Sequence, residues 1–147
     1  MKKTASYFWL GFCVLLLFIA VGPWSWPGKK QAEWRVNAFI KAVNANRPGD
    51  VYLFLTPELK AMLSREEFRH NFAKERSYPY LTPLYLYLDE VKLSSDRRSG
   101  EALLTVAARL PGEKMRVKLI YTKGQYYIEA FRDIADGSYL HKFEALK

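Results

Sequence analysis

The sequence predicts an α+β fold in which an N-terminal transmembrane helix is followed by three helices packed on a bent four-stranded antiparallel sheet. The chain carries no charge from Thr4 to Gly28, a run of 25 residues. In the first half of the remainder, apolar residues recur at helical spacing, and in the second half they follow strand patterns between short turns. We therefore expect a transmembrane anchor at 1–26, a linker at 27–30 and a folded domain at 31–147.

The anchor prediction follows from length and from the placement of aromatic residues. The 16 positions from Tyr7 to Gly22 are almost wholly apolar and give a helix of ~24 Å. Continuing the helix to Trp26 brings it close to the ~30 Å hydrocarbon core of a bilayer. Aromatic rings, which prefer the headgroup level, stand at both ends: Tyr7, Phe8 and Trp9 at one, Trp24 and Trp26 at the other.

A cleaved secretory signal and a lipid anchor are the alternatives to an uncleaved helix. A signal needs small residues before the cut. Cleavage after Ala20 places Phe18 three residues before the bond, and cleavage after Gly22 places Pro23 directly after it. A lipid anchor would use Cys13, which lies inside the apolar run.

Lysines at the two ends of the run bear on orientation. Lys2 and Lys3 precede it, and Lys29, Lys30 and Arg35 follow it, so the positive-inside rule is nearly balanced. We expect a cytoplasmic N-terminus, because the short head leaves only its two lysines and amino group to hold inside. The protein is then a single-pass cell-membrane protein with an extracytoplasmic domain.

The 119 residues from Lys29 to Lys147, which follow the charge-free run, are enough for one domain with one core. They hold 21 Lys or Arg and 15 Asp or Glu, because Lys2 and Lys3 account for two of the 23 basic residues. The excess of positive charge favours anionic partners, either lipid headgroups or an acidic protein surface. Nucleic acid is the least favoured of these for an exported domain.

The first helix is expected from Gln31 to about Asn46. It buries the i, i+3, i+4, i+7 stripe of Val36, Phe39, Ile40 and Val43 and exposes Arg35, Lys41 and Asn44. Asn46 to Gly49 stops it. A short turn capped by Asp50 follows, and then a second helical piece that starts with Thr56-Pro57.

The third helix begins with a capping-box pattern. Ser64 and Glu67 are spaced so that each side chain bonds the other's backbone N–H. The helix runs to about Ser77 and buries Phe68 and Phe72.

Four strands are expected in the second half, at Leu84–Leu93, Ala102–Ala108, Lys114–Thr122 and Gln125–Phe131. Lys123-Gly124 forms a tight hairpin between the last two. Short turns between successive strands predict an antiparallel meander, whose apolar face the preceding helices cover.

This order of elements resembles the nuclear transport factor 2-like superfamily. The resemblance covers about residues 31 to 133. It is carried by the break at Asn46–Asp50, the phrase Leu55–Leu59, the helix start at Ser64–Phe68 and the final strand ending Gly124–Phe131. The chain is similar to small exported bacterial members of this superfamily and to the N-terminal domain of the methicillin-resistance penicillin-binding proteins. In layout it is also similar to inner-membrane assembly components of type IV secretion systems. The resemblance implies a bent sheet around a long helix, forming a cone whose open end holds a pocket; some members are enzymes and many only bind or assemble.

Asp89 is the candidate base if the domain is an enzyme. It is expected mid-strand on the same face as Tyr85, Tyr87 and Val91, and tyrosine hydroxyls can stabilise an oxyanion. His70 and His141 are expected at the surface. With one cysteine and two histidines 71 residues apart, the sequence predicts no metal site, and it has no phosphate-binding glycine loop, so no cofactor is expected.

The main hypothesis is a noncatalytic, membrane-tethered extracytoplasmic binding or assembly domain. Its partner is a membrane protein, an envelope complex or anionic lipid, with a small-molecule ligand as the alternative. The candidate binding residues are cations and tyrosines: Lys114, Arg116 and Lys118 on one strand face, Arg65 and Arg69 on the third helix, and Tyr85 and Tyr87.

Overall fold

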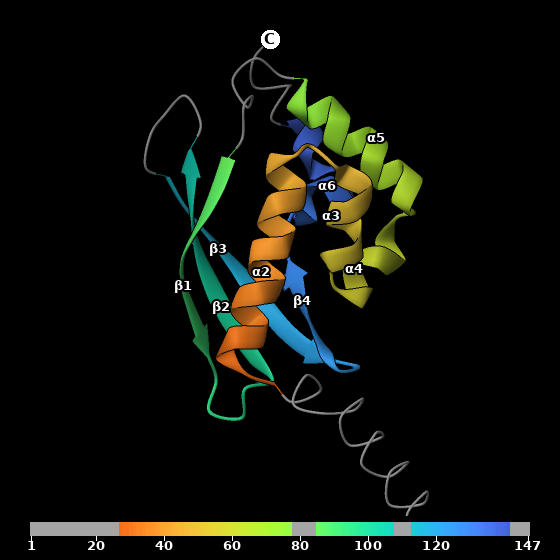
Figure 1. The fold of residues 1–147 in the computed structure, drawn as a ribbon. Helices are drawn as coiled ribbons and strands as arrows, with labels where there is room; N and C mark the ends of the chain where they lie inside the picture. Colours follow the sequence, from red (N-terminus) through yellow and green to blue (C-terminus); the bar gives the residue numbers. More distant parts are fainter. Residues whose placement is uncertain (1–26, 78–84, 108–112, 142–147) are drawn as a thin grey trace, which may run out of the picture.

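The computed structural model describes residues 27–77, 85–107 and 113–141, which form an α+β domain (Figure 1). Its elements in chain order are α2 (Lys29–Asn44), α3 (Pro48–Phe54), α4 (Pro57–Met62), α5 (Arg65–Arg76), β1 (Tyr85–Leu93), β2 (Ser99–Ala107), β3 (Glu113–Thr122), β4 (Gln125–Glu129), α6 (Arg132–Asp136) and the 3₁₀ turn η2 (Ser138–Leu140). The expected α+β class and the four-stranded antiparallel sheet are confirmed. The expected number of three helices is wrong: α3, which starts at Pro48 and has Asp50 in its first turn, forms where a short turn was expected, and α6 follows the sheet.

The expected transmembrane helix at 1–26 lies outside the described residues. Among those that are described, no helix is long and apolar enough to cross a membrane.

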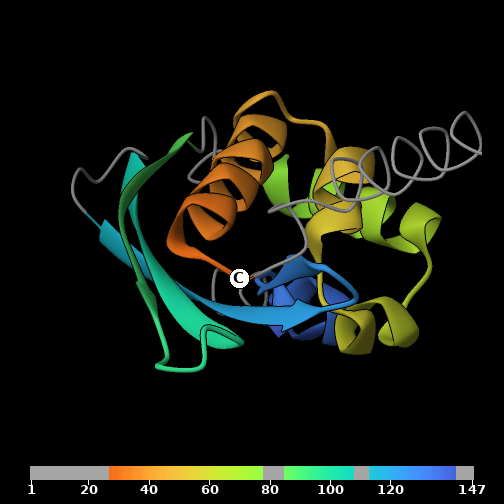
Figure 2. The ribbon, with the colours of Figure 1, turned by 60° about the horizontal axis from the view of Figure 1, so that its bottom comes forward.

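The sheet is a meander of order β1-β2-β3-β4, with every neighbouring pair antiparallel. Lys123 and Gly124 both have positive φ, at 49° and 79°, and connect the paired residues Thr122 and Gln125. This is the backbone of a two-residue hairpin, as the sequence predicts. Figure 2 shows the sheet curving around α2, which lies against its concave face.

The predicted helix caps are present. The Leu59 N–H donates to the Thr56 hydroxyl at 3.3 Å, and Ser64 and Glu67 form both bonds of the capping box, at 3.2 and 2.7 Å. These bonds satisfy backbone N–H donors that have no partner within the first helical turn. Helices α4 and α5 therefore begin directly after their capping residues, Thr56 and Ser64.

The core fills the space between the concave face of the sheet and the helices. Buried side chains of α2 meet alternating buried residues of all four strands. The half-buried Phe131 packs against this core and contacts three other rings, with centroid distances of 6.0, 6.5 and 5.3 Å to Phe39, Phe68 and Phe72. The expected burial of the three helical phenylalanines is confirmed, since each is at most 1% exposed.

The end of the chain differs from the prediction. The last strand was expected to reach Phe131, but β4 ends at Glu129 and Phe131 has a left-handed φ of 56°. Packing of its ring into the aromatic cluster holds this conformation, and the turn directs the chain into α6, whose Ile134 is fully buried.

Two polar residues of α2 were also expected to be exposed and are not. The Asn44 side chain bonds the N–H and C=O of Leu86 at 2.8 and 3.0 Å, so it pairs with the free edge of β1. Arg35 donates to the Tyr126 carbonyl at 3.0 Å on the opposite edge strand, β4. Both side chains therefore cover open sheet edges.

Candidate functional site

The outer sheet face is the convex side of the sheet, opposite α2. It carries the candidate residues Tyr87, Asp89, Lys114, Arg116 and Lys118, together with Glu101, Thr105 and Glu129. On β3 the expected alternation is present, because Val117 and Leu119 are buried and the three cations are exposed. The strand period alone places these cations on one face.

Each of these three cations is paired with a carboxylate on another strand. Lys114 Nζ lies 2.8 Å from Asp89, Arg116 Nη1 3.6 Å from Glu101, and Lys118 Nζ 3.9 Å from Glu129. The cations of β3 thus form a ladder with alternating signs across the sheet. The face that the sequence predicts as basic is close to neutral.

Asp89 sits at a β-bulge. The register between β1 and β2 shifts between Leu88 and Glu90, so both Asp89 and Glu90 lie on the outer face. The expectation that Asp89 shares a face with Val91 is wrong for this reason, because Val91 is 2% exposed and points into the core. Tyr85 and Tyr87 do share the face of Asp89, and they are 43% and 57% exposed.

Hydrogen bonds hold the Asp89 carboxylate in its ionised form. Lys114 Nζ donates to it at 2.8 Å, and the Thr105 hydroxyl lies 2.8 and 2.9 Å from its two oxygens. The bonds from Lys114, and then from Thr105, lower the pKa of Asp89. A general base works best with a pKa near the working pH, so these contacts weaken Asp89 as a base.

The candidate arginines of α5 make local contacts. Arg65 donates to the Gly49 carbonyl at 2.9 Å, which ties the start of α5 to α3, and Arg69 pairs with Glu66 at 2.9 Å. Neither lies near the outer sheet face. The structure therefore does not bring the two groups of candidate cations together.

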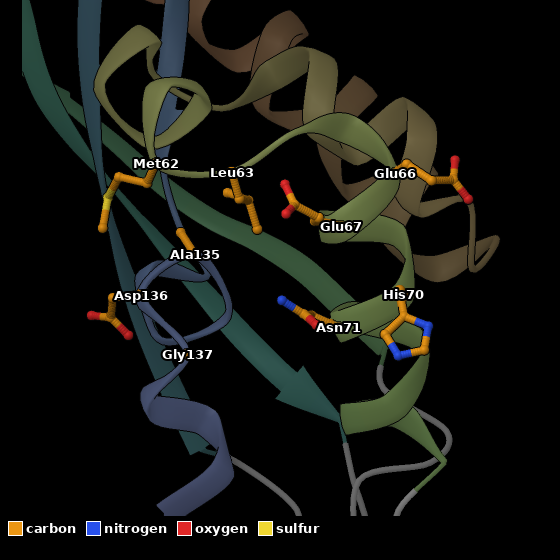
Figure 3. Close-up of a pocket in the computed structure, with 9 residues that line it drawn as sticks. All are labelled: Met62, Leu63, Glu66, Glu67, His70, Asn71, Ala135, Asp136 and Gly137. Carbon is orange, nitrogen blue, oxygen red and sulfur yellow. The ribbon is translucent and has the colours of Figure 1, made fainter.

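An open depression of about 600 Å³ lies between α4, α5 and α6 (Figure 3). Its polar groups already bond the backbone or side chains around them: Glu67 caps α5, Asp136 accepts from the Ser138 N–H at 2.9 Å, and Asn71 accepts from the Tyr139 hydroxyl at 3.2 Å. His70 is exposed at its rim, as expected. Within the described ranges, no group of three His, Cys, Asp or Glu could hold a metal ion.

The sequence analysis did not predict that two cations, Arg35 and Lys60, are half-buried. Lys60 Nζ and Arg35 Nη2 both donate to the Leu53 carbonyl at the end of α3, at 2.9 and 3.5 Å. Lys60 also lies 5.0 Å from the centre of the Tyr127 ring, and Arg35 4.3 Å from that of Phe54. Burial lowers the pKa of both, and for Lys60 the charge of Arg35 adds to the effect. Cations at a helix C-terminus are a stabilising arrangement, so these two have a structural use.

A second surface, the basic end, was also missed. We define it as the end of the domain at which the chain enters α2, with five exposed cations: Lys29, Lys30, Arg97, Arg98 and Lys123. It unites the start of α2, the turn after β1 and the turn after β3 (Figure 1). The only sequence signal was the presence of Arg or Lys at both turns, which does not reveal that the turns meet.

Neither a protein-family model nor a curated protein sequence matches this chain.

Proposed function

We propose that this protein is a noncatalytic, membrane-tethered extracytoplasmic domain that binds a protein partner of the cell envelope through its outer sheet face. One observation carries the proposal: the concave side of the sheet is filled by apolar core, whereas charged and aromatic side chains gather on the convex side. Recognition on such a domain is a matter of surface contact.

The outer sheet face suits protein recognition in two respects. Exposed tyrosines at positions 85 and 87 supply apolar area with a polar tip, a combination enriched at interfaces. The paired charges of β3 and its neighbours form a fixed pattern of both signs, which favours a complementary partner and repels others. A small hollow of about 40 Å³ lies beside the bulge, lined by both charge signs.

The class of the domain is proposed on element order. A long helix against the concave face of a curved meander, preceded by no strand in the described ranges, agrees with the layout expected of nuclear transport factor 2-like proteins. The tether is proposed from the charge-free run and its aromatic ends.

The alternative function is an enzyme or a small-molecule carrier that uses Asp89. It gains little from the geometry, because Asp89 lies on the exposed face with a lowered pKa. A carrier would use the depression in Figure 3, but this depression is open and two of its acids already bond the local backbone.

Photo-crosslinking in the full-length protein tests the proposal. A photoreactive phenylalanine analogue replaces Tyr87, and a control protein carries it at Lys74, an exposed position on α5. We expect one crosslinked protein product from position 87 and none from position 74. Equal products from both positions, or none from position 87, would refute docking on the outer sheet face.

Two further measurements separate the parts of the proposal. Mature protein that begins after Gly22 would refute the tether while leaving the docking face intact. Loss of function in a folded Asp89→Asn variant that still gives the crosslink would favour the enzyme.

A further inference from the structure

The basic end carries more positive charge than the domain neutralises. Two carboxylates, Glu33 and Asp96, lie beside its five cations. Glu33 lies 3.9 Å from Lys29, and Asp96 accepts from the Ser94 hydroxyl and the Arg98 N–H. Within the described ranges, no carboxylate lies within 4.0 Å of the side-chain nitrogens of Lys30, Arg97, Arg98 or Lys123.

Hydrogen bonds fix the three parts of this end together. The Tyr126 hydroxyl donates to the Arg97 carbonyl at 2.6 Å. Gln31 Nε2 donates to the Gly124 carbonyl at 3.1 Å, and the Tyr121 N–H donates to the Arg98 carbonyl at 2.8 Å. Both turns are thus held beside the first residues of α2, and their cations share one end of the domain.

The chain outside the structure ends at this same place. The charge-free run closes with Trp26 and Pro27-Gly28, immediately before α2. Gly28 is two residues beyond Trp26 and Gln31 is five, so an extended chain of ~3.5 Å per residue spans at most ~7 and ~18 Å respectively. If Trp26 lies at headgroup level, the turn after β3, which is bonded to Gln31, is held close to the bilayer surface. The turn after β1 is bonded to Tyr121 and Tyr126 on the neighbouring strands and lies at the same end.

We propose that the basic end docks on anionic lipid headgroups and so sets the orientation of the domain on the membrane, an inference that rests on the proposed membrane tether. Headgroup phosphates are the anions nearest to these cations, and clustered Lys and Arg beside a membrane segment bind anionic lipid. Docking by this end directs the outer sheet face and the β3 ladder sideways from the tether, where a partner has access. Exposed charges interact over about 8–10 Å at physiological salt, so high salt releases the docked state.

Hydrogen exchange of the full-length protein in lipid nanodiscs tests the inference. Discs of phosphatidylcholine are compared with discs that also contain phosphatidylglycerol, at low and high salt. We expect amides of the two turns, 94–98 and 122–125, to exchange several-fold more slowly in the anionic discs at low salt only. Each cation removed should weaken docking about fivefold.

The matched variants carry the same charge change at two places. Arg97→Gln/Arg98→Gln/Lys123→Gln should abolish the difference between discs, and Lys114→Gln/Arg116→Gln/Lys118→Gln should retain it. Equal exchange in both disc types, or equal loss in both variants, would overturn the docking. Protein that is not recovered with the discs would refute the tether and the docking together, whereas inserted protein with unchanged turns would refute the docking alone.

Discussion

The outer sheet face and the basic end carry similar numbers of cations and differ in what surrounds them. On the outer sheet face, antiparallel register places Asp89, Glu101 and Glu129 beside the three cations of β3. At the basic end, four of the five cations have no carboxylate within 4.0 Å among the described residues. Counting charged residues therefore does not locate a basic surface, because the field depends on which charges fold together.

The largest effect tests whether the two surfaces share one scaffold. Phe72 is 1% exposed in the aromatic cluster, so Phe72→Ala should lower the free energy of unfolding by ~3–5 kcal/mol. Urea denaturation of the full-length protein in detergent measures this loss. Because that loss is a large fraction of the stability of a typical domain, partner crosslinking and lipid docking should fail together. A variant that keeps either one would show that the surfaces do not depend on a common core.

Gly100 should give the next largest effect, because the end of β1 leaves no room for a Cβ at this position of β2. A Cβ at this position would collide with the Lys92 carbonyl oxygen and lie 2.7 Å from Leu93 Cδ2. Gly100→Ala should cost ~1–3 kcal/mol, measured by the same urea denaturation. The matched control is Ser99→Ala, one residue earlier at an exposed site. Equal stability of the two variants would contradict the close approach.

Neutralising the three cations of the β3 ladder should affect binding at the outer sheet face but not at the basic end. Lys114→Gln/Arg116→Gln/Lys118→Gln should weaken partner recovery on the order of tenfold and leave lipid docking intact. Glutamine is preferred to glutamate, because a reversed charge would face a carboxylate of a neighbouring strand and destabilise the sheet. Unchanged partner recovery in the folded variant would show that the β3 cations are not part of the interface.

The contacts of Asp89 on the outer sheet face predict that its contribution to the free energy of unfolding depends on pH. Bonds from Lys114 and Thr105 lower the pKa of Asp89 in the folded state, so its contribution to stability is present above the unfolded pKa of about 3.9. The contribution is lost as pH falls through the lower folded pKa. The urea midpoints of the wild type and Asp89→Asn should therefore differ near neutral pH, begin to converge below about pH 4 and coincide only below the folded pKa. A difference that persists at acid pH would show that the carboxylate is not held by these bonds.

The smallest effect concerns stability at the basic end. Arg97→Gln/Arg98→Gln/Lys123→Gln should change the free energy of unfolding by no more than about 0.5 kcal/mol, because these cations have few contacts to lose. Urea denaturation at low and high salt provides the measurement. A large loss would mean that the side chains stabilise the turns, and the exchange experiment would then need other variants.

Local sequence patterns account for much of the secondary structure of this domain. The capping box at Ser64, the hairpin at Lys123-Gly124 and the order of the four strands depend on residues close together in the chain, and each is present. The period of β3 likewise placed Lys114, Arg116 and Lys118 on one exposed face.

The contacts between these elements depend on tertiary packing, which no local pattern predicts. The bulge at Asp89 turned that residue and Val91 to opposite faces, because one extra residue in a strand shifts the alternation. The register between strands determines which carboxylate pairs with each cation of β3. The packing of the Phe131 ring determines where β4 ends and the chain turns into α6. The basic end joins residues about 90 positions apart, such as Gln31 and Gly124, and a contact of that separation follows from packing rather than from any local pattern.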